Sequence, residues 1–120
     1  MYRWSVYTWC MTELPLREPT FLILTALAAS PQHGYGIMTD VAQISGGRVR
    51  LRAGTLYAAL NRLATDGLVE FDREEIVDAR LRRYYRLTPV GARRLQQEVD
   101  RMRSTTTVAA QRLRLLGGTS

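Results

Sequence analysis

The sequence has almost none of the residues on which most catalytic and metal centres depend. Its 120 residues include one cysteine, Cys10, and one histidine, His33. A single cysteine excludes an internal disulfide and any cysteine-based zinc cluster, and it indicates a reducing compartment, the cytoplasm. The chain also lacks a glycine-rich phosphate loop and a convergent set of titratable groups. We therefore expect a protein that is not an enzyme and that uses no metal or cofactor.

Lysine and long apolar runs are also missing. All 17 basic residues are arginine, against 11 acidic residues, which gives a formal net charge of +6. No stretch reaches the ~18 apolar residues that a membrane crossing needs. A basic chain predicts an acidic partner, most often nucleic acid, and arginine holds phosphate in a planar, bidentate geometry. An arginine-rich coding bias is the alternative explanation for the missing lysines.

A chain of this length holds one modest hydrophobic core, so we expect one folded domain with terminal additions. Residues 1–12 contain both tryptophans and lack the apolar segment and cleavage site of a secretory signal. We interpret them as an N-terminal extension, either loosely ordered or packed as an aromatic arm on a partner subunit. Residues 13–88 are predicted to form the domain, 89–116 a separate helix and 117–120 a tail.

Two helices are expected to build the core. Pro19 stands in a first helical turn, and the helix that follows is too apolar on every side for a surface helix and ends at Ser30–Pro31. Its apolar residues are Phe21, Leu22, Ile23, Leu24, Leu27 and Ala28. A second helix is predicted from about Tyr35 to Ile44, closed by Gly46–Gly47. Its inward residues are expected to be Ile37, Met38, Val41 and Ile44.

The stretch from Arg52 to Val69 has the pattern of a recognition helix. Val49 and Leu51 alternate with arginines and predict a short strand-like link into it. Four apolar residues recur at i, i+3, i+4 and i+7, the spacing of a helix packed on a core. They are Leu56, Ala59, Leu60 and Leu63. The opposite face has no acid before Asp66, and Gly67 follows where a left-handed cap residue is favoured. The two core helices, the link and this helix follow one another in the order of a helix-turn-helix. We therefore predict that the polar face of this helix binds DNA.

Two strand-like segments follow at 68–73 and 83–87, separated by a charged loop at 74–82. When they pair, one side is expected to carry Val69, Phe71, Tyr85 and Leu87, and the outward side Tyr84 and Arg86. A hairpin directly after a recognition helix is a wing, and its arginines are placed for phosphates or the minor groove. These arginines are Arg80, Arg82, Arg83 and Arg86. The alternative is a solvated hairpin whose arginines pair with Asp72, Glu74, Glu75 and Asp78.

A long final helix is predicted from Thr88–Pro89 to Leu116, with Gly117–Gly118 after it. Its seam residues are spaced alternately by three and four, as in a heptad repeat. They are Ala92, Leu95, Val99, Met102, Thr106, Ala109, Leu113 and Leu116. Such a helix extends ~42 Å, too far to be buried on a small domain. We expect the seam from Leu95 onward to form a homodimer interface. The alternative is a helix that folds back on its own domain.

Five segments carry a family resemblance when they are taken together and in order. They are EPTFLILTAL (18–27), HGYGI (33–37), GTLYAALNRL (54–63), DGLVE (66–70) and RRYYRLTPVG (82–91). From about residue 13 to residue 116 the chain resembles the PadR family of transcriptional regulators, in the short subgroup with a single C-terminal helix. The resemblance implies a mainly α winged helix-turn-helix with a small β-hairpin. It further implies a dimer that binds a roughly palindromic operator, usually as a repressor, and that is often released by a small molecule.

The resemblance implies DNA contacts by Thr55, Tyr57 and Arg62 on the recognition helix, with Tyr35 pressing on the DNA backbone. Residue chemistry adds Asn61, whose amide has the donor and acceptor pattern for adenine. The complete predicted DNA-binding set is Tyr35, Arg52, Thr55, Tyr57, Asn61, Arg62, Arg80, Arg82, Arg83 and Tyr84. Plain alternatives are Thr55 as a helix cap, Tyr57 as a half-buried flank and Asn61 as a solvated residue.

The effector and the rival functions are less well defined by the sequence. Some relatives are expected to stack planar ligands on an aromatic side chain between the paired C-terminal helices, but here no aromatic residue follows Tyr85. Val99 and Met102 are the remaining candidates for an effector site. The alternatives are a regulator with no ligand and one that senses through the N-terminal aromatic residues. His33 is expected to act at a helix start rather than as a pH switch. The alternative function is a winged-helix protein-interaction module with only non-specific DNA affinity. A membrane-surface protein is not expected, because the charge does not follow one amphipathic face.

Overall fold

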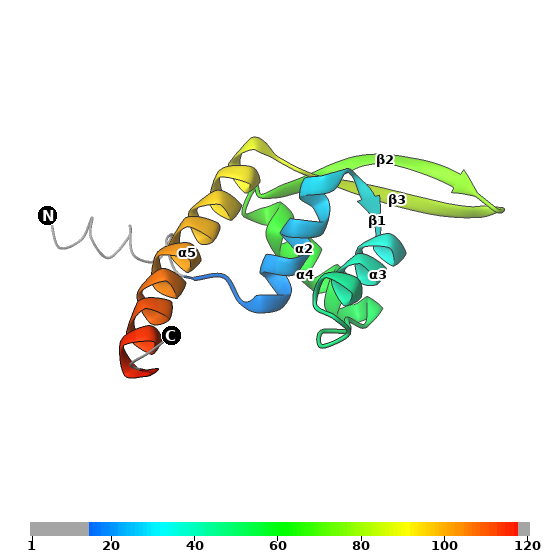
Figure 1. Ribbon diagram of the computed structural model, residues 1–120. Helices are drawn as coiled ribbons and strands as arrows, with labels where there is room; N and C mark the ends of the chain where they lie inside the picture. The colour runs from blue at the N-terminus through cyan, green and yellow to red at the C-terminus, as the bar shows by residue number, and fades with distance from the viewer. Residues whose placement is uncertain (1–14, 118–120) are drawn as a thin grey trace, which may run out of the picture.

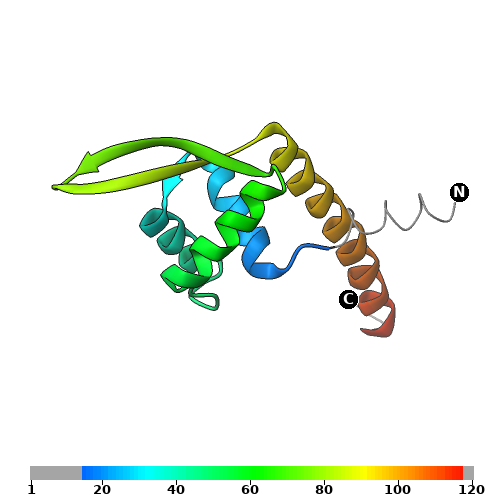
Figure 2. The ribbon, with the colours of Figure 1, turned by 180° about the vertical axis from the view of Figure 1, so that it is seen from behind.

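The computed structural model describes residues 15–117, and its elements follow in the order α2, β1, α3, α4, β2, β3 and α5. Helices α2, α3 and α4 gather into one cluster, the β2–β3 hairpin extends from one side of it, and α5 runs away on the other side (Figures 1 and 2). This arrangement is the predicted winged helix-turn-helix with a long C-terminal helix. The expected extension at 1–12 and residues 118–120 lie outside the described residues. No helix within 15–117 has the length and apolarity needed to span a bilayer.

Helix α2 (Glu18–Ala29) lies at the centre of the core, as its composition predicted. Its buried residues are Leu22, Ile23, Leu24, Ala26 and Leu27. Ala28 was expected to be buried but is exposed, because it falls in the last turn before the chain becomes extended at Ser30. The remaining buried core comes from α3, α4 and the start of β2.

Helix α3 (Gly34–Ile44) matches the second predicted helix, and Ile37 and Val41 are fully buried. Ile44 was predicted to face inward, but its side chain is 44% exposed, since it lies in the final turn where the chain leaves the core. A two-residue strand, β1 (Gln32–His33), precedes α3 and pairs antiparallel with β3. Strand β1 was not predicted, because two residues are too few to show an alternating pattern.

The predicted strand-like link before α4 is wrong. Val49 and Leu51 pack against the core, but the segment pairs with no strand in the described chain. Instead, the Ser45 hydroxyl accepts a hydrogen bond from the Val49 N–H at 3.0 Å. The helix that follows, α4 (Ala53–Thr65), buries all four predicted stripe residues.

Gly67 ends α4 in the way its position predicted. Its φ of +78° is the left-handed conformation that glycine adopts without a Cβ penalty. The Gly67 N–H donates to the Ala64 carbonyl and the Leu68 N–H donates to the Leu63 carbonyl, which is the hydrogen-bond pattern of a Schellman cap. The cap turns the chain directly into the wing.

The wing is longer than predicted. Strands β2 (Val69–Val77) and β3 (Arg80–Leu87) are joined by a two-residue turn, so most of the predicted loop at 74–82 is strand. Asp78 and Ala79 have φ values of +52° and +64°, as in a type I′ hairpin turn. This turn was not predicted because it contains no glycine or asparagine. The predicted cross-strand pairs at the base of the wing, Val69 with Leu87 and Phe71 with Tyr85, are confirmed.

Helix α5 (Pro89–Gly117) begins where the sequence predicted. The Thr88 hydroxyl accepts from the Gly91 N–H at 2.9 Å and donates to the Gly67 carbonyl at 2.6 Å, which ties the start of α5 to the end of α4. Leu95 packs on the core, whereas every residue from Arg103 to Gly117 is exposed. Only the first part of α5 therefore belongs to the domain core.

Candidate nucleic-acid interface

The open face of α4 carries the predicted recognition residues. All five of them, Arg52, Thr55, Tyr57, Asn61 and Arg62, are exposed. Within residues 15–117 no side chain caps the N-terminus of α4, so the N–H groups of its first turn have no capping partner there. Thr55 therefore does not act as the cap that its plain interpretation supposed. The face is cationic and polar, and it carries the positive end of a helix dipole.

The N-terminus of α3 lies next to α4, because Tyr57 rests on Gly34. A Cβ atom at Gly34 would come within 2.3 Å of the Tyr57 hydroxyl oxygen, so only glycine leaves room for this tyrosine. Tyr57 is still 42% exposed, and it is thus both a flank of α4 and an accessible side chain. The neighbouring Tyr35 is largely exposed. The HGYGI segment thus makes room for a tyrosine on the recognition helix.

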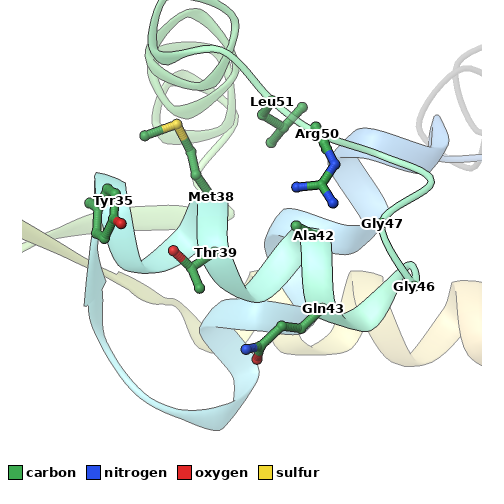
Figure 3. A pocket seen from close by; sticks show the side chains of 9 residues that line it. All are labelled: Tyr35, Met38, Thr39, Ala42, Gln43, Gly46, Gly47, Arg50 and Leu51. Atoms are coloured by element: carbon green, nitrogen blue, oxygen red, sulfur yellow. The ribbon is translucent and has the colours of Figure 1, made fainter.

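An open hollow of about 570 Å³ lies between α3 and the segment that leads into α4 (Figure 3). It is lined by Tyr35, Met38, Thr39, Ala42, Gln43, Gly46, Gly47, Arg50 and Leu51. A Cβ atom at Gly47 would lie 3.2 Å from an Arg50 guanidinium nitrogen, so Arg50 folds over this glycine. Arg50 was not among the predicted contacts. It could have been found only as one of several arginines on a link that was mistaken for a strand.

Two wing arginines are held by acidic neighbours. The ion pairs are Arg86–Glu70, Arg86–Asp72, Arg73–Asp72 and Arg73–Glu75, with N–O distances of 2.6–2.8 Å. Hydrogen bonds from Arg73 and Arg86 lower the pKa of Asp72. For Arg86 the structure therefore agrees with the alternative interpretation of paired wing charges. Arg83 is 3.7 Å from Glu74, a loose contact, and Arg80 has no ion pair within the described residues.

Arg82 points toward α3 rather than along the wing. Its Nη1 lies 3.2 Å from His33 Nδ1, and its guanidinium carbon lies 5.9 Å from the centre of the Tyr35 ring. His33 Nδ1 also accepts from the Gly36 N–H at 3.2 Å, so the expected role of this histidine at a helix start is confirmed. Burial, followed by the charge of Arg82, lowers the pKa of His33.

Tyr84, a predicted DNA contact, lies beside the contact between Arg82 and His33. Its ring meets the His33 ring edge-on at 5.2 Å, and the Arg73 guanidinium lies 4.1 Å from its centre on the wing. Arg73 was placed at the end of the first predicted strand, but sequence reasoning did not name it as a site residue. The N-terminus of α3 thus lies between α4, through Tyr57, and the wing, through Arg82.

The predicted seam of α5 divides into two parts. Leu95, Val99 and Met102 are half-buried. Farther along, Thr106, Ala109, Leu113 and Leu116 are exposed, and the Thr106 hydroxyl donates to its own helix at the Met102 carbonyl. Leu113 and Leu116 expose 66% and 83% of their surface.

Sequence comparison finds similar bacterial proteins. The transcriptional regulator Rv3488 of Mycobacterium tuberculosis is 41% identical over 76 residues, which cover 63% of this chain and 67% of that protein. An uncharacterized 37.1 kDa protein in transposon TN4556 of Streptomyces fradiae is 40% identical over 85 residues. That alignment covers 71% of this chain but only 23% of the transposon protein.

Solved structures share the fold. A PadR family transcription regulator from Clostridium difficile superposes with a TM-score of 0.67 at 26% identity, covering 81% of this chain and 99% of that one. Bacillus subtilis PadR in complex with operator DNA gives a TM-score of 0.61 at 24% identity, covering 69% of this chain and 47% of that one. The model of the transcriptional regulator PadR-like family matches residues 23–97, more than half of the sequence. The chain therefore belongs to the PadR-like family of transcriptional regulators.

Proposed function

We propose that this chain is a sequence-specific DNA-binding regulator that acts as a repressor, and as a homodimer, on a roughly palindromic operator. The observation that carries the proposal is the open face of α4, which exposes Arg52, Asn61 and Arg62 and has no acid before Asp66. Its apolar stripe is buried, so the helix can present this face without loss of the core. The operator complex of the related Bacillus subtilis PadR supports the proposal, since the two share a fold.

In this proposal α4 lies in the major groove. Asn61 offers a donor and an acceptor to adenine, and Arg62 offers two donors to guanine. Thr55 and Tyr57, near the N-terminus of α4, are placed for phosphates together with the uncapped N–H groups. Tyr35 would contact the DNA backbone from α3.

The wing supplies contacts that do not depend on sequence. Arg80 has no carboxylate partner in the described chain, and Arg83 has only a loose one, so both can neutralise phosphates or enter the minor groove. Arg86 is not assigned to DNA, because it is held by two acidic side chains. Tyr84 lies at the base of this surface, against His33.

The homodimer is proposed to form through the seam of α5. Exposed Leu113 and Leu116 would be covered by the same residues of a second copy, which sets two recognition helices about one DNA turn apart, ~34 Å. The half-buried Val99 and Met102 lie on the same seam, and they are the positions where we expect a small-molecule effector to enter.

The test is fluorescence anisotropy with duplex DNA from upstream of the protein's own coding region, against scrambled duplex, over a salt series. We expect a preference of ~10³-fold or more for the upstream DNA and a steep salt slope. Equal and weak binding to both duplexes would favour the protein-interaction module instead. No binding at low salt would refute the DNA proposal.

Three variants separate the proposed contacts. Arg62→Ala should change the preference between operator sequences, since a side chain that reads bases is removed. Arg80→Ala should weaken binding to all duplexes and reduce the salt slope by about 1. Arg93→Ala is the matched control, because Arg93 is exposed on α5 and belongs to neither α4 nor the strands of the wing. If Arg62→Ala and Arg93→Ala behave alike, α4 does not read bases.

A further inference from the structure

One wing arginine differs from the others in its surroundings. Arg82 is half-buried, and its Nε is buried with no hydrogen-bond partner within the described residues. Its Nη1 meets His33 Nδ1 at 3.2 Å, across the junction where His33 pairs with Tyr84 in the sheet. Arg82 directs its guanidinium at His33 and keeps one donor buried, so it is poorly placed to contact phosphate.

The histidine in this contact must be neutral to accept. Nδ1 of His33 accepts from the Gly36 N–H and faces Arg82, so the ring proton resides on Nε2. A second proton, placed on Nδ1, would remove the cap of α3 and set an imidazolium beside a guanidinium. The lowered pKa of His33 agrees with this arrangement.

The other charged groups around this contact do not compensate for a second proton on His33. On the wing, Arg73 lies over the far partner of the ring stack, Tyr84, and is itself paired with Glu75 and Asp72. On α3, Asp40 accepts from the Gln32 amide at 3.3 Å. A protonated His33 would therefore face the cation of Arg82 from β3, while the charge of Arg73 beyond Tyr84 is already balanced by its own two carboxylates.

We propose that Arg82 and His33 are a positioning pair, which sets the angle of the wing to α3 and hence to the recognition helix. The proposal rests on the DNA-binding function proposed above, and it assigns Arg82 a role in orientation rather than in phosphate contact. Since Tyr57 of α4 rests on Gly34 beside His33, the two residues where β1 meets α3 hold both proposed DNA-binding elements. The wing is correctly placed only while His33 is neutral.

The first test needs no DNA. His33 is the only histidine, so after removal of any affinity tag its imidazole gives a single set of proton NMR signals to titrate. Arg82→Gln, which removes the charge and keeps a polar side chain, should raise the His33 pKa toward 6.5. Arg83→Gln is the matched control on the neighbouring residue and should leave this pKa unchanged. If both variants leave it unchanged, the pair does not exist in solution.

The second test is the salt and pH dependence of binding to the upstream duplex. Arg82→Gln should lower affinity without changing the salt slope, whereas Arg83→Gln should lower the slope by about 1. If Arg82→Gln lowers the slope as Arg83→Gln does, Arg82 is a phosphate contact and the proposal is wrong.

The pH profile distinguishes positioning from simple support of the fold. Because the His33 pKa is depressed in the folded protein, its contribution is complete above pH 6.5 and is lost as the pH falls through the folded-state pKa. Below that pKa the Kd of the wild-type protein should rise by up to about tenfold for each pH unit. His33→Asn keeps a capping oxygen but cannot titrate in this range, so its profile should be flat.

The outcomes separate this inference from the proposed function. If no duplex is bound at any pH, the DNA proposal fails, while the NMR titration still decides whether Arg82 and His33 are paired. If the titration shows the pair but wild type and His33→Asn have the same pH profile for DNA, the pair does not position the wing and the inference is overturned.

Discussion

Helices α4 and α5 are both amphipathic, but they bury their apolar stripes in different ways. In α4, Leu56 and Leu60 are completely buried, and Leu63 is 4% exposed. In α5, burial decreases along the helix, from Leu95 on the core to Leu113 and Leu116 at the exposed end. The apolar stripe of α4 is therefore buried by residues of the same chain, whereas that of α5 is buried only near the start of the helix.

This difference indicates which surface of each helix is available for function. The buried stripe of α4 holds the helix in place, so its polar face is the surface that can meet a ligand. The exposed seam of α5 leaves leucines in water, and it is the surface at which we propose a partner. The two helices thus separate the proposed roles of DNA recognition and dimerisation.

The largest effect is expected from Leu60→Ala. Leu60 is completely buried in the stripe of α4, so its truncation should lower the free energy of unfolding by ~2–5 kcal/mol. Denaturant unfolding followed by circular dichroism measures this change. Ala58→Ser, on the exposed face of the same helix, should stay within ~0.5 kcal/mol of wild type. A similar loss in both variants would mean that α4 is not divided into a structural and an open face.

A large effect of a different kind is expected from Leu113→Asp. An aspartate in the proposed seam should weaken dimerisation by ~2 kcal/mol or more, a roughly thirtyfold rise in the dimer Kd, since a charge replaces one of the two exposed leucines near the end of the seam. Sedimentation equilibrium measures the dimer Kd. Gln111→Asp, on the opposite side of α5, is the control and should keep the wild-type mass. If Leu113→Asp keeps that mass as well, the seam does not join two copies.

Gly91→Ala tests the packing of the start of α5 against the end of α4. A Cβ atom there would come within 2.0 Å of the Leu68 carbonyl oxygen, which is backbone and cannot rotate away. We expect a loss of stability of ~1–3 kcal/mol, from the displacement of the start of α5. Ala92→Ser, at the exposed neighbouring position, should leave the unfolding midpoint nearly unchanged. An unchanged midpoint for Gly91→Ala would show that α5 is not packed tightly against the end of α4.

The fold could be predicted from the sequence where periodicity is strong. The stripe of α4 and the seam of α5 repeat at helical spacing over several turns, and the proline and threonine at 88–89 fix where α5 begins. The tip of the wing could not be predicted in this way. Its strands at 74–82 are held by pairing with each other rather than by an apolar face, and the turn at Asp78–Ala79 lacks the residues that mark such turns.

The open face of α4 was predictable because it is simply the side opposite the stripe. The roles of the wing arginines were not, because they depend on register. A bulge between Phe71 and Arg73 shifts the pairing of β2 by one residue, which brings Asp72 to Arg86. Sequence alone could count the charges in the wing, but it could not show that Arg82 turns away from them toward His33.

The smallest expected effect is that of Gly54→Ala, and its sign is the informative part. Gly54 lies in the first turn of α4, and a Cβ atom there would meet nothing within 4 Å. Alanine should therefore stabilise the fold by ~0.5–1 kcal/mol, since glycine is the weaker helix former. If the uncapped first turn approaches DNA phosphate, the same methyl group should weaken binding to the upstream duplex.

Gly46→Ala is not a suitable control, because its φ of +64° makes any side chain there strained. Ala64→Ser, near the other end of α4 and exposed, should change neither property appreciably. Greater stability with unchanged DNA affinity would place the first turn of α4 outside the interface, and then the recognition surface would have to begin later on the helix.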